Sequence, residues 1–123
     1  MSKPPSEYRL QRLTVLAERA IHAAFPEIKE FGGYRPDALK WHPNGLAIDV
    51  MIPNPTSAQG KALGDRVLTF VMANAKRFGL DHAIWRQTMY TQGSAPQLMA
   101  DRGSLTQNHF DHVHVATSGG GYP

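Results

Sequence analysis

Residues 42–51 read His-Pro-Asn-Gly-Leu-Ala-Ile-Asp-Val-Met and contain the pattern that decides the fold. From residue 46 on, large aliphatic side chains alternate with Ala47, Asp49 and Met51, which is the two-residue period of a strand with one face on a core. Pro53 ends this strand, because proline cannot donate to a sheet ladder. The stretch therefore predicts a strand that displays a carboxylate, Asp49, on the face opposite its core-facing side chains.

A second strand is predicted near the C-terminus, where residues 109–116 read His-Phe-Asp-His-Val-His-Val-Ala. If its two valines face the core, the strand period puts His112 and His114 together on the other face, so that two imidazoles lie side by side. Two neutral imidazoles and one carboxylate, such as Asp49, form a three-ligand set typical of a catalytic zinc, with the fourth position open for water.

These residues also have simpler interpretations. A His-x-His pair on a strand is often a surface pair without metal, and Asp49 could form a salt bridge with Arg35 or another cation. A carboxylate flanked by Ile48 and Val50 is costly unless it is paired or metal-bound. The residue pattern leaves both the metal site and the ion pair open.

The rest of the chain predicts helices around these strands. Apolar residues at three- and four-residue spacings predict a helix over residues 7–25, with Ser6 as its N-cap. A second helix is predicted from Thr56 or Ser57 to Gly79. Short strands are predicted at residues 28–31, 83–85 and 88–90, and one long loop is predicted at residues 91–108. We therefore expect an α+β domain, with a small, mainly antiparallel sheet and helices packed on it.

The composition limits the classes of protein to which this chain can belong. Its 123 residues, 41% of them hydrophobic, suit one domain, which we place at residues 1–117, with residues 118–123 as a flexible glycine-rich tail or linker start. Because there is no cysteine, any bound transition metal must be held by histidine and carboxylate. We expect no membrane span, no export signal in this sequence, and no nucleic-acid binding, since the net charge of +3 is not gathered into a basic run with aromatics.

The two histidine motifs resemble those of a known group of zinc peptidases. His42-x-x-Gly45-x-Ala47-x-Asp49 is similar to the H-x-x-G-x-A-x-D motif of the D-Ala-D-Ala carboxypeptidase, L-Ala-D-Glu peptidase and Hedgehog-like group, and the late His-x-His is similar to its closing motif. The resemblance implies a Hedgehog/DD-peptidase-like fold in which the matching residues His42, Asp49 and His114 bind Zn2+. Gly45 would let the loop of His42 come close, and the small Ala47 leaves room beside the carboxylate.

The late motif also indicates how a bound zinc would be used. His109-x-x-His112-x-His114 is most similar to the penicillin-insensitive murein endopeptidases, in which the histidine matching His112 is implicated in catalysis. Many members of the group carry a glutamate base shortly before the last histidine, but the last glutamate here is Glu30, so we expect His112 to be the base. Strand alternation should turn Asp111 away from the two histidines, and we expect it to orient a neighbour. His109 would orient His112 or contact substrate.

Three further residues are candidates for the substrate side of the site. Residues 33–35 resemble a G-Y-R segment whose arginine faces substrate in several members of the group, so Arg35 is expected to hold a substrate carboxylate or a developing oxyanion, unless it only pairs with Asp49. Trp85 could line the cleft or lie in the core, and Asp101 could belong to a substrate wall or to a solvated turn. No role is assigned to two other histidines, His22 and His82.

Over nearly its whole length the chain resembles an actinobacterial family of cell-wall-associated domains often described only as hypothetical. We therefore expect a zinc metallopeptidase of the carboxypeptidase or endopeptidase type, which cleaves an amide bond in peptidoglycan stem peptides or crosslinks. It would act outside the cytoplasm or at the cell wall, as a monomer or as part of a longer multidomain chain. One alternative is a non-catalytic, zinc-containing cell-wall binding module of the same fold. A weaker one, a metal-dependent phosphoesterase, would need paired H-x-T motifs that are missing here.

Overall fold

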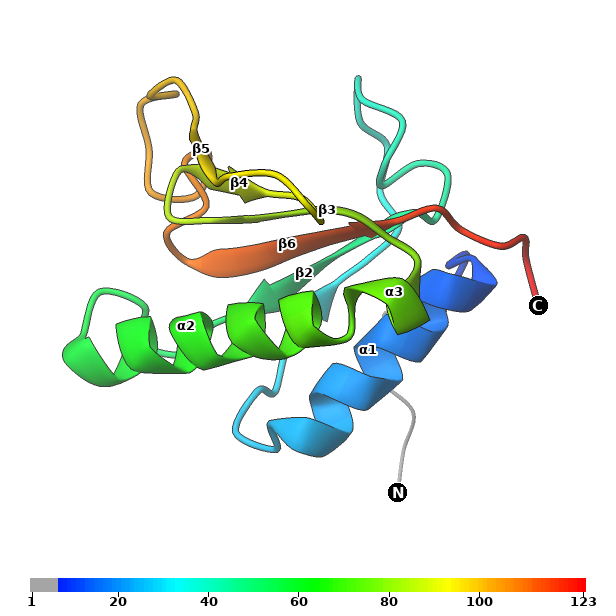
Figure 1. Ribbon diagram of the computed structural model, residues 1–123, viewed down its shortest axis with the longest axis horizontal. Helices are drawn as coiled ribbons and strands as arrows, with labels where there is room; N and C mark the ends of the chain where they lie inside the picture. Colours follow the sequence, from blue (N-terminus) through cyan, green and yellow to red (C-terminus); the bar gives the residue numbers. More distant parts are fainter. Residues whose placement is uncertain (1–6) are drawn as a thin grey trace.

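The computed structural model describes residues 7–123, which form a six-stranded sheet and three helices (Figure 1). The strand order is β1-β2-β6-β3-β4-β5, and every neighbouring pair is antiparallel. The α+β class expected from the sequence is confirmed. In chain order the elements are α1 (Arg12–Ala24), β1 (Phe31–Gly32), β2 (Ala47–Met51), α2 (Ala58–Ala73), α3 (Ala75–Phe78), β3 (Leu80–Trp85), β4 (Thr88–Tyr90), β5 (Gln97–Leu98) and β6 (His112–Thr117).

The two strands with alternating patterns lie next to each other in the sheet. β2 and β6 pair so that Asp49 lies opposite His114 and Val50 lies opposite Val113. β3 lies on the other side of β6, with Ile84 opposite His114. His114 therefore has a strand on each side, and the strand register itself places Asp49 next to it.

The two faces of the sheet differ in chemistry. One face packs on α1 and α2 through an aliphatic core that includes Ile48, Val50, Val113 and Val115, each fully buried. Figure 1 shows these helices below the sheet and two long loops rising on the other side, one between β1 and β2 and one between β4 and β6. Strand alternation turns the histidines of β6 and the carboxylate of β2 towards the loops.

The first helix is shorter than the sequence pattern indicates. α1 begins at Arg12 and not at residue 7, because residues 7–9 form a separate turn in which Arg9 has a φ of 59°, outside the range of an α-helix. The residue at its N-cap is Gln11. Ser6, the cap expected from the sequence, lies outside the described residues.

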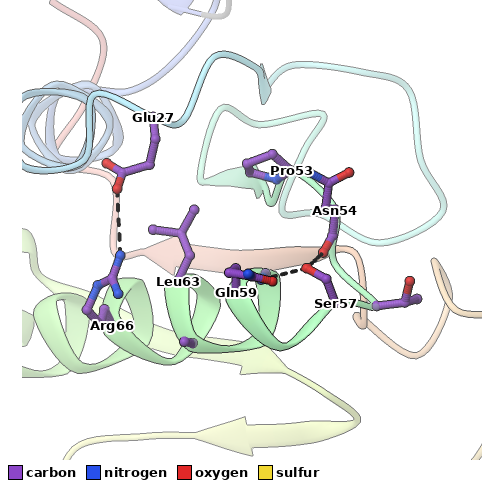
Figure 2. Close-up of a pocket in the computed structure, with 10 residues that line it drawn as sticks. Glu27, Pro53, Asn54, Ser57, Gln59, Leu63 and Arg66 are labelled. Atoms are coloured by element: carbon purple, nitrogen blue, oxygen red, sulfur yellow. Dashed lines mark hydrogen bonds and ion pairs between the residues drawn. The ribbon is translucent and has the colours of Figure 1, made fainter.

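The second helix begins where it was predicted and is broken once before its end. Ser57 is the N-cap of α2: its Oγ accepts the backbone N–H of Gly60 at 3.0 Å and donates to the carbonyl of Asn54 at 2.7 Å (Figure 2). The helix stops at Asn74, and the single turn of α3 then ends at Gly79, whose φ of 59° is the left-handed conformation that glycine adopts readily.

Trp85 lies in the core, so its assignment to the cleft wall is wrong. Its side chain is 2% exposed, its ring lies against Gly64 of α2, and its Nε1 donates to Oδ1 of Asp65 at 2.9 Å. The preceding residue, Ile84, lines the cleft on the loop side of the sheet. The two-residue strand period therefore turns the indole to the helix side.

Gly64 allows this contact, and its replacement should be costly. A methyl group at position 64 would overlap with Cζ2 of Trp85. We expect Gly64→Ala to lower the free energy of unfolding by about 2 kcal/mol, because overpacking outweighs the gain in helix propensity. Urea unfolding followed by circular dichroism measures this, with Ala62→Ser, at an exposed position of α2, as a control that stays within about 0.5 kcal/mol of wild type. An unchanged stability of Gly64→Ala would contradict the described packing.

Candidate metal centre

Three imidazoles converge on one carboxylate oxygen in the middle of the sheet. Oδ1 of Asp49 lies 3.1 Å from Nδ1 of His114, 3.5 Å from Nε2 of His42 and 3.6 Å from Nε2 of His112. All four residues are buried, with exposed fractions between 3% and 6%. Strands β2 and β6 supply three of them, and the loop between β1 and β2 supplies His42.

His42 is held with one ring nitrogen free for a ligand. Its Nδ1 lies 2.9 Å from the carbonyl oxygen of Gly33, which can only accept, so Nδ1 carries the proton. Nε2 then has the lone pair, and this buried atom has no hydrogen-bond partner within residues 7–123. The loop reaches this position through Gly45, whose φ is +68° and whose missing side chain leaves room for the carbonyl of Arg9.

A metal ion fits this arrangement. The ligand atoms of His42, Asp49 and His114 all lie within 4.8 Å of one another, and within the described chain this is the one group of three such residues that does so. A buried Nε2 with a lone pair and no donor to satisfy it is what a missing cation would leave behind. These are the three residues expected from the sequence to bind metal, and the structure brings them together.

The protonation states also suit a cation. Burial by itself would raise the pKa of the Asp49 carboxyl, but the hydrogen bond from His114 and the nearby His112 outweigh it and hold that pKa far below its usual range. Burial lowers the pKa of His114 despite its bond to Asp49. An ionised carboxylate beside a neutral imidazole, as at Asp49 and His114, is the state in which such residues bind metal ions.

Arg35 pairs with the same carboxylate through its other oxygen. Nη1 of Arg35 lies 2.8 Å from Oδ2 of Asp49, whereas the three imidazoles gather at Oδ1. The sequence left open whether Asp49 forms a salt bridge with Arg35 or binds metal. The structure contains the salt bridge together with a geometry that can hold metal. The Arg35 side chain is 49% exposed and lines the cleft, so it could also contact a ligand.

His112 has the geometry of an oriented base. Oδ1 of Asp111 lies 2.7 Å from its Nδ1, which fixes the proton there and leaves Nε2 to face Asp49. The expectation that strand alternation turns Asp111 away is wrong, because Asp111 precedes β6 and lies in a bend. Asp111 does orient a neighbour, as expected, because it holds the ring of His112. The hydroxyl of Thr106 donates to Oδ2 of the same carboxylate at 2.7 Å.

His109 lies beside these rings without a bond to either. Its ring centre is 4.7 Å from that of His112 and 5.7 Å from that of His114. Burial, with these two imidazoles close by, lowers the pKa of His109 to about 4. His109 is therefore a neutral side chain that lines the cleft at neutral pH.

The cleft above the sheet has a volume of about 860 Å³ and is walled by the two long loops. Its lining combines the metal-site residues and two arginines with an apolar set made up of Leu39, Met51, Ile84, Met89 and Met99. Asp101 does not line the cleft, which corrects its place in a substrate wall. Its Oδ1 accepts from the backbone of Gly103 and from the side chain of Asn108, both at 2.8 Å, and so shapes the turn that brings Arg102 to the cleft.

His82 also lies in the cleft, although no role was assigned to it from the sequence. Its ring stacks on that of His114, with centres 5.2 Å apart and planes 28° from parallel. The sequence pattern indicated a strand from residue 83, but β3 begins at Leu80 and has an irregular register before His82. The even spacing from His82 to Ile84 was the available signal, and it could be used only with the strand start correctly placed.

A second hollow lies beside α2, away from the histidines. It has a volume of about 770 Å³ and includes the ion pair of Arg66 with Glu27, at 3.6 Å (Figure 2). Both of these side chains are about half exposed, and the hollow is lined by no histidine. Its chemistry offers no site comparable with the histidine cleft.

The comparisons place the chain in one family. A family model described as VldE, C-terminal domain, matches residues 6–110. The chain belongs to the VldE C-terminal domain family. The matched region contains His42 and Asp49 and ends before His112 and His114. No curated protein and no solved structure matches the chain. None of the helices within residues 7–123 is long and apolar enough to cross a membrane.

Removal of the Asp49 charge should abolish metal binding. We expect Asp49→Asn to weaken binding of Zn2+, used as a probe, by at least about 100-fold, because the ligand set loses its only carboxylate. Competition against a zinc-sensitive dye measures the affinity. Glu27→Gln removes a carboxylate 49% exposed and outside the cleft, and should leave it unchanged. Equal zinc affinity in Asp49→Asn and wild type would rule out this ligand set.

The metal-free protein should lose stability in mildly acidic solution. The folded pKa of His109, about 4, lies below its ordinary value of 6.5, so the unfolded chain binds more protons between these values. Stability is therefore complete above about pH 6.5 and falls as the pH drops towards 4. Urea unfolding of chelator-treated protein at pH 7.5, 6 and 4.5 measures the slope, which His109→Gln should reduce. A slope unchanged by this variant would show that His109 is not the group involved.

Proposed function

We propose that this domain is a zinc-dependent peptidase that hydrolyses an amide bond in peptidoglycan stem peptides or crosslinks. One observation carries the proposal: the buried group His42, Asp49 and His114 can hold a metal ion, and Nε2 of the oriented His112 faces the same carboxylate oxygen. Zinc is the metal that suits two imidazoles, one carboxylate and an open fourth position. The resemblance of the two motifs to the zinc peptidase group supports the substrate class.

In such a reaction each residue around the site would have a separate role. A zinc ion on His42, Asp49 and His114 would polarise the scissile carbonyl and acidify water. His112 can accept the proton of the attacking water at Nε2, because Asp111 keeps the other nitrogen protonated, and can return it to the leaving amine. Asp111 thereby positions the imidazole and stabilises its charged form, as an acid behind a catalytic histidine does.

Arg35 is the candidate for binding the negative charge of the substrate or of the transition state. One of its guanidinium nitrogens is held by Asp49, and the half-exposed remainder of the group lines the cleft. A guanidinium fixed in this way is preorganised to bind a carboxylate or an oxyanion. Arg102, on the opposite loop, adds a second cation to the lining.

A peptidase with this substrate would act outside the cytoplasm or at the cell wall, and the lining of the cleft suits a peptide. The cleft is walled by two loops and has three methionines in its lining, a flexible apolar surface that suits the aliphatic parts of a peptide. A binding module of the same fold that holds zinc without turnover is the alternative, and the first experiment below separates the two.

The purified domain should contain about one zinc per chain and release new amine ends from peptidoglycan. Elemental analysis measures the metal, and mass spectrometry of digested actinobacterial peptidoglycan, with and without a chelator, measures cleavage. Chelator-sensitive cleavage supports the peptidase. Zinc without cleavage of any stem peptide would select the binding module, and a protein that takes up no zinc after supplementation would refute the proposal.

His112 should be needed for turnover but not for metal. We expect His112→Gln to lower kcat by about 100- to 10,000-fold while zinc stays bound, because it removes the proton acceptor and no ligand. Asp111→Asn should have a smaller effect, about 10- to 100-fold, since it disturbs only the orientation of the ring. Kinetics on a stem peptide and zinc content are measured on the same samples. Undiminished hydrolysis by His112→Gln would remove its role as base.

A further inference from the structure

We propose that Asp81 and His82 form a second polar subsite in the cleft, which binds an ammonium group of the ligand through Nε2 of His82. The subsite lies outside the group that can hold metal and is formed by β3, which contributes none of those ligands. The proposal rests on the proposed function only in taking the ligand to be a peptide.

The ring of His82 is fixed from two sides. Across the sheet His82 pairs with Ala116, so it is diagonal to His114, and its ring stacks on that imidazole at 5.2 Å. On another side the indole of Trp41 meets it nearly edge-on, with centres 4.8 Å apart and planes at 79°. His82 is 6% exposed, so its ring is held by packing, as a preorganised binding group must be.

Asp81 fixes the polarity of this ring. Its Oδ1 lies 2.8 Å from Nδ1 of His82, and because a carboxylate only accepts, Nδ1 carries the proton. The lone pair of the neutral ring is then on Nε2. Within residues 7–123 the bond to Asp81 is the only one that His82 makes through its ring nitrogens, and the residue lines the cleft. A nearly buried acceptor of this kind is satisfied by a donor that enters the cleft.

The charges near His82 favour a cationic donor. The Asp81 side chain is 49% exposed, and both it and Asp37 line the cleft. Of the two arginines that line the cleft, Arg35 is paired with Asp49 and Arg102 lies on the opposite loop. An ammonium group can donate to Nε2 and remain close to the carboxylates, whereas a ligand carboxylate would meet a lone pair and two negative charges.

The subsite is distinct from the pair Asp111 and His112, although both consist of an aspartate followed by its histidine. Nε2 of His112 faces Oδ1 of Asp49 at 3.6 Å, where a bound metal and the reacting atoms would lie. His82 stacks on the ring of His114 and forms no ion pair with Asp49. The first pair is therefore suited to proton transfer, and the second to holding part of the ligand.

The kinetic test uses two synthetic stem pentapeptides with lysine at the third position, one with its amines free and one with both amines acetylated. For the free-amine peptide, His82→Phe should raise KM about tenfold with kcat within about threefold, because the ring stack is kept and the acceptor is lost. His82→Gln, whose amide oxygen can replace Nε2, should restore KM to within about threefold of wild type. For the acetylated peptide His82→Phe should have no effect. Glu27→Gln, outside the cleft, is the control and should behave as wild type.

Several outcomes of this test would overturn the subsite. An unchanged KM in His82→Phe would do so, as would an equal effect on both peptides. A fall in kcat with loss of zinc, not rescued by His82→Gln, would instead give His82 a structural role in support of His114. Thermal melts of each variant confirm that the compared proteins are folded.

A second measurement keeps the subsite separate from the proposed function. If the wild-type domain cleaves neither peptide, the peptidase proposal fails, and long-range proton–nitrogen spectra of the histidine rings still decide the subsite. At pH 8 these should show His82 protonated at Nδ1 and not at Nε2, and the free-amine peptide should shift the Nε2 resonance while the acetylated one does not. A proton on Nε2, or the same response to both peptides, would refute the proposal.

Discussion

The pairing of β2 with β6 is the constraint on which both the fold and the site depend. The register that sets Val50 opposite Val113 in the core also sets Asp49 opposite His114 on the other face. Because the side-chain period of a strand is two, a slip of one residue would turn these polar groups into the core and the valines out of it. The packing of the apolar core therefore also fixes the positions of the Asp49 carboxylate and the His114 imidazole.

The carboxylate of Asp49 joins its own strand, β2, to two other parts of the chain through its two oxygens. Oδ2 binds Arg35 of the first long loop, and Oδ1 faces His42 of the same loop and His114 of β6. A salt bridge and a metal site are often treated as competing explanations of a buried acid. Here they use different lone pairs, and the bond from the arginine to Oδ2 helps to fix the rotamer of the carboxylate, which is what a metal ligand requires.

Much of the fold and the common facing of Asp49 and His114 could be predicted from the sequence, because both depend on local periodicity, whereas His42 was expected as a ligand only from the resemblance of its motif. Alternation identified the strands that carry Asp49 and His114, whereas Trp85 was expected either in the cleft or in the core, and the structure has it in the core. The features that could not be predicted from the sequence depend on tertiary contacts. The start of β3, which brings His82 onto the ring of His114, is set by pairing across the sheet, and the bend at Asp111 is set by the loop before β6.

The polar face of this sheet is hard to explain by stability. His42, Asp49, His112 and His114 are each at most 6% exposed, and burial of such groups costs free energy that hydrogen bonds at best offset. Apolar residues at the same positions would extend the core, which the helix side already provides. A small domain has little stability to spare. Nε2 of His42 has no hydrogen-bond partner among residues 7–123, so the described part of the chain does not satisfy the cluster, and the arrangement makes physical sense as a site for a cation and for the molecule that the cation acts on.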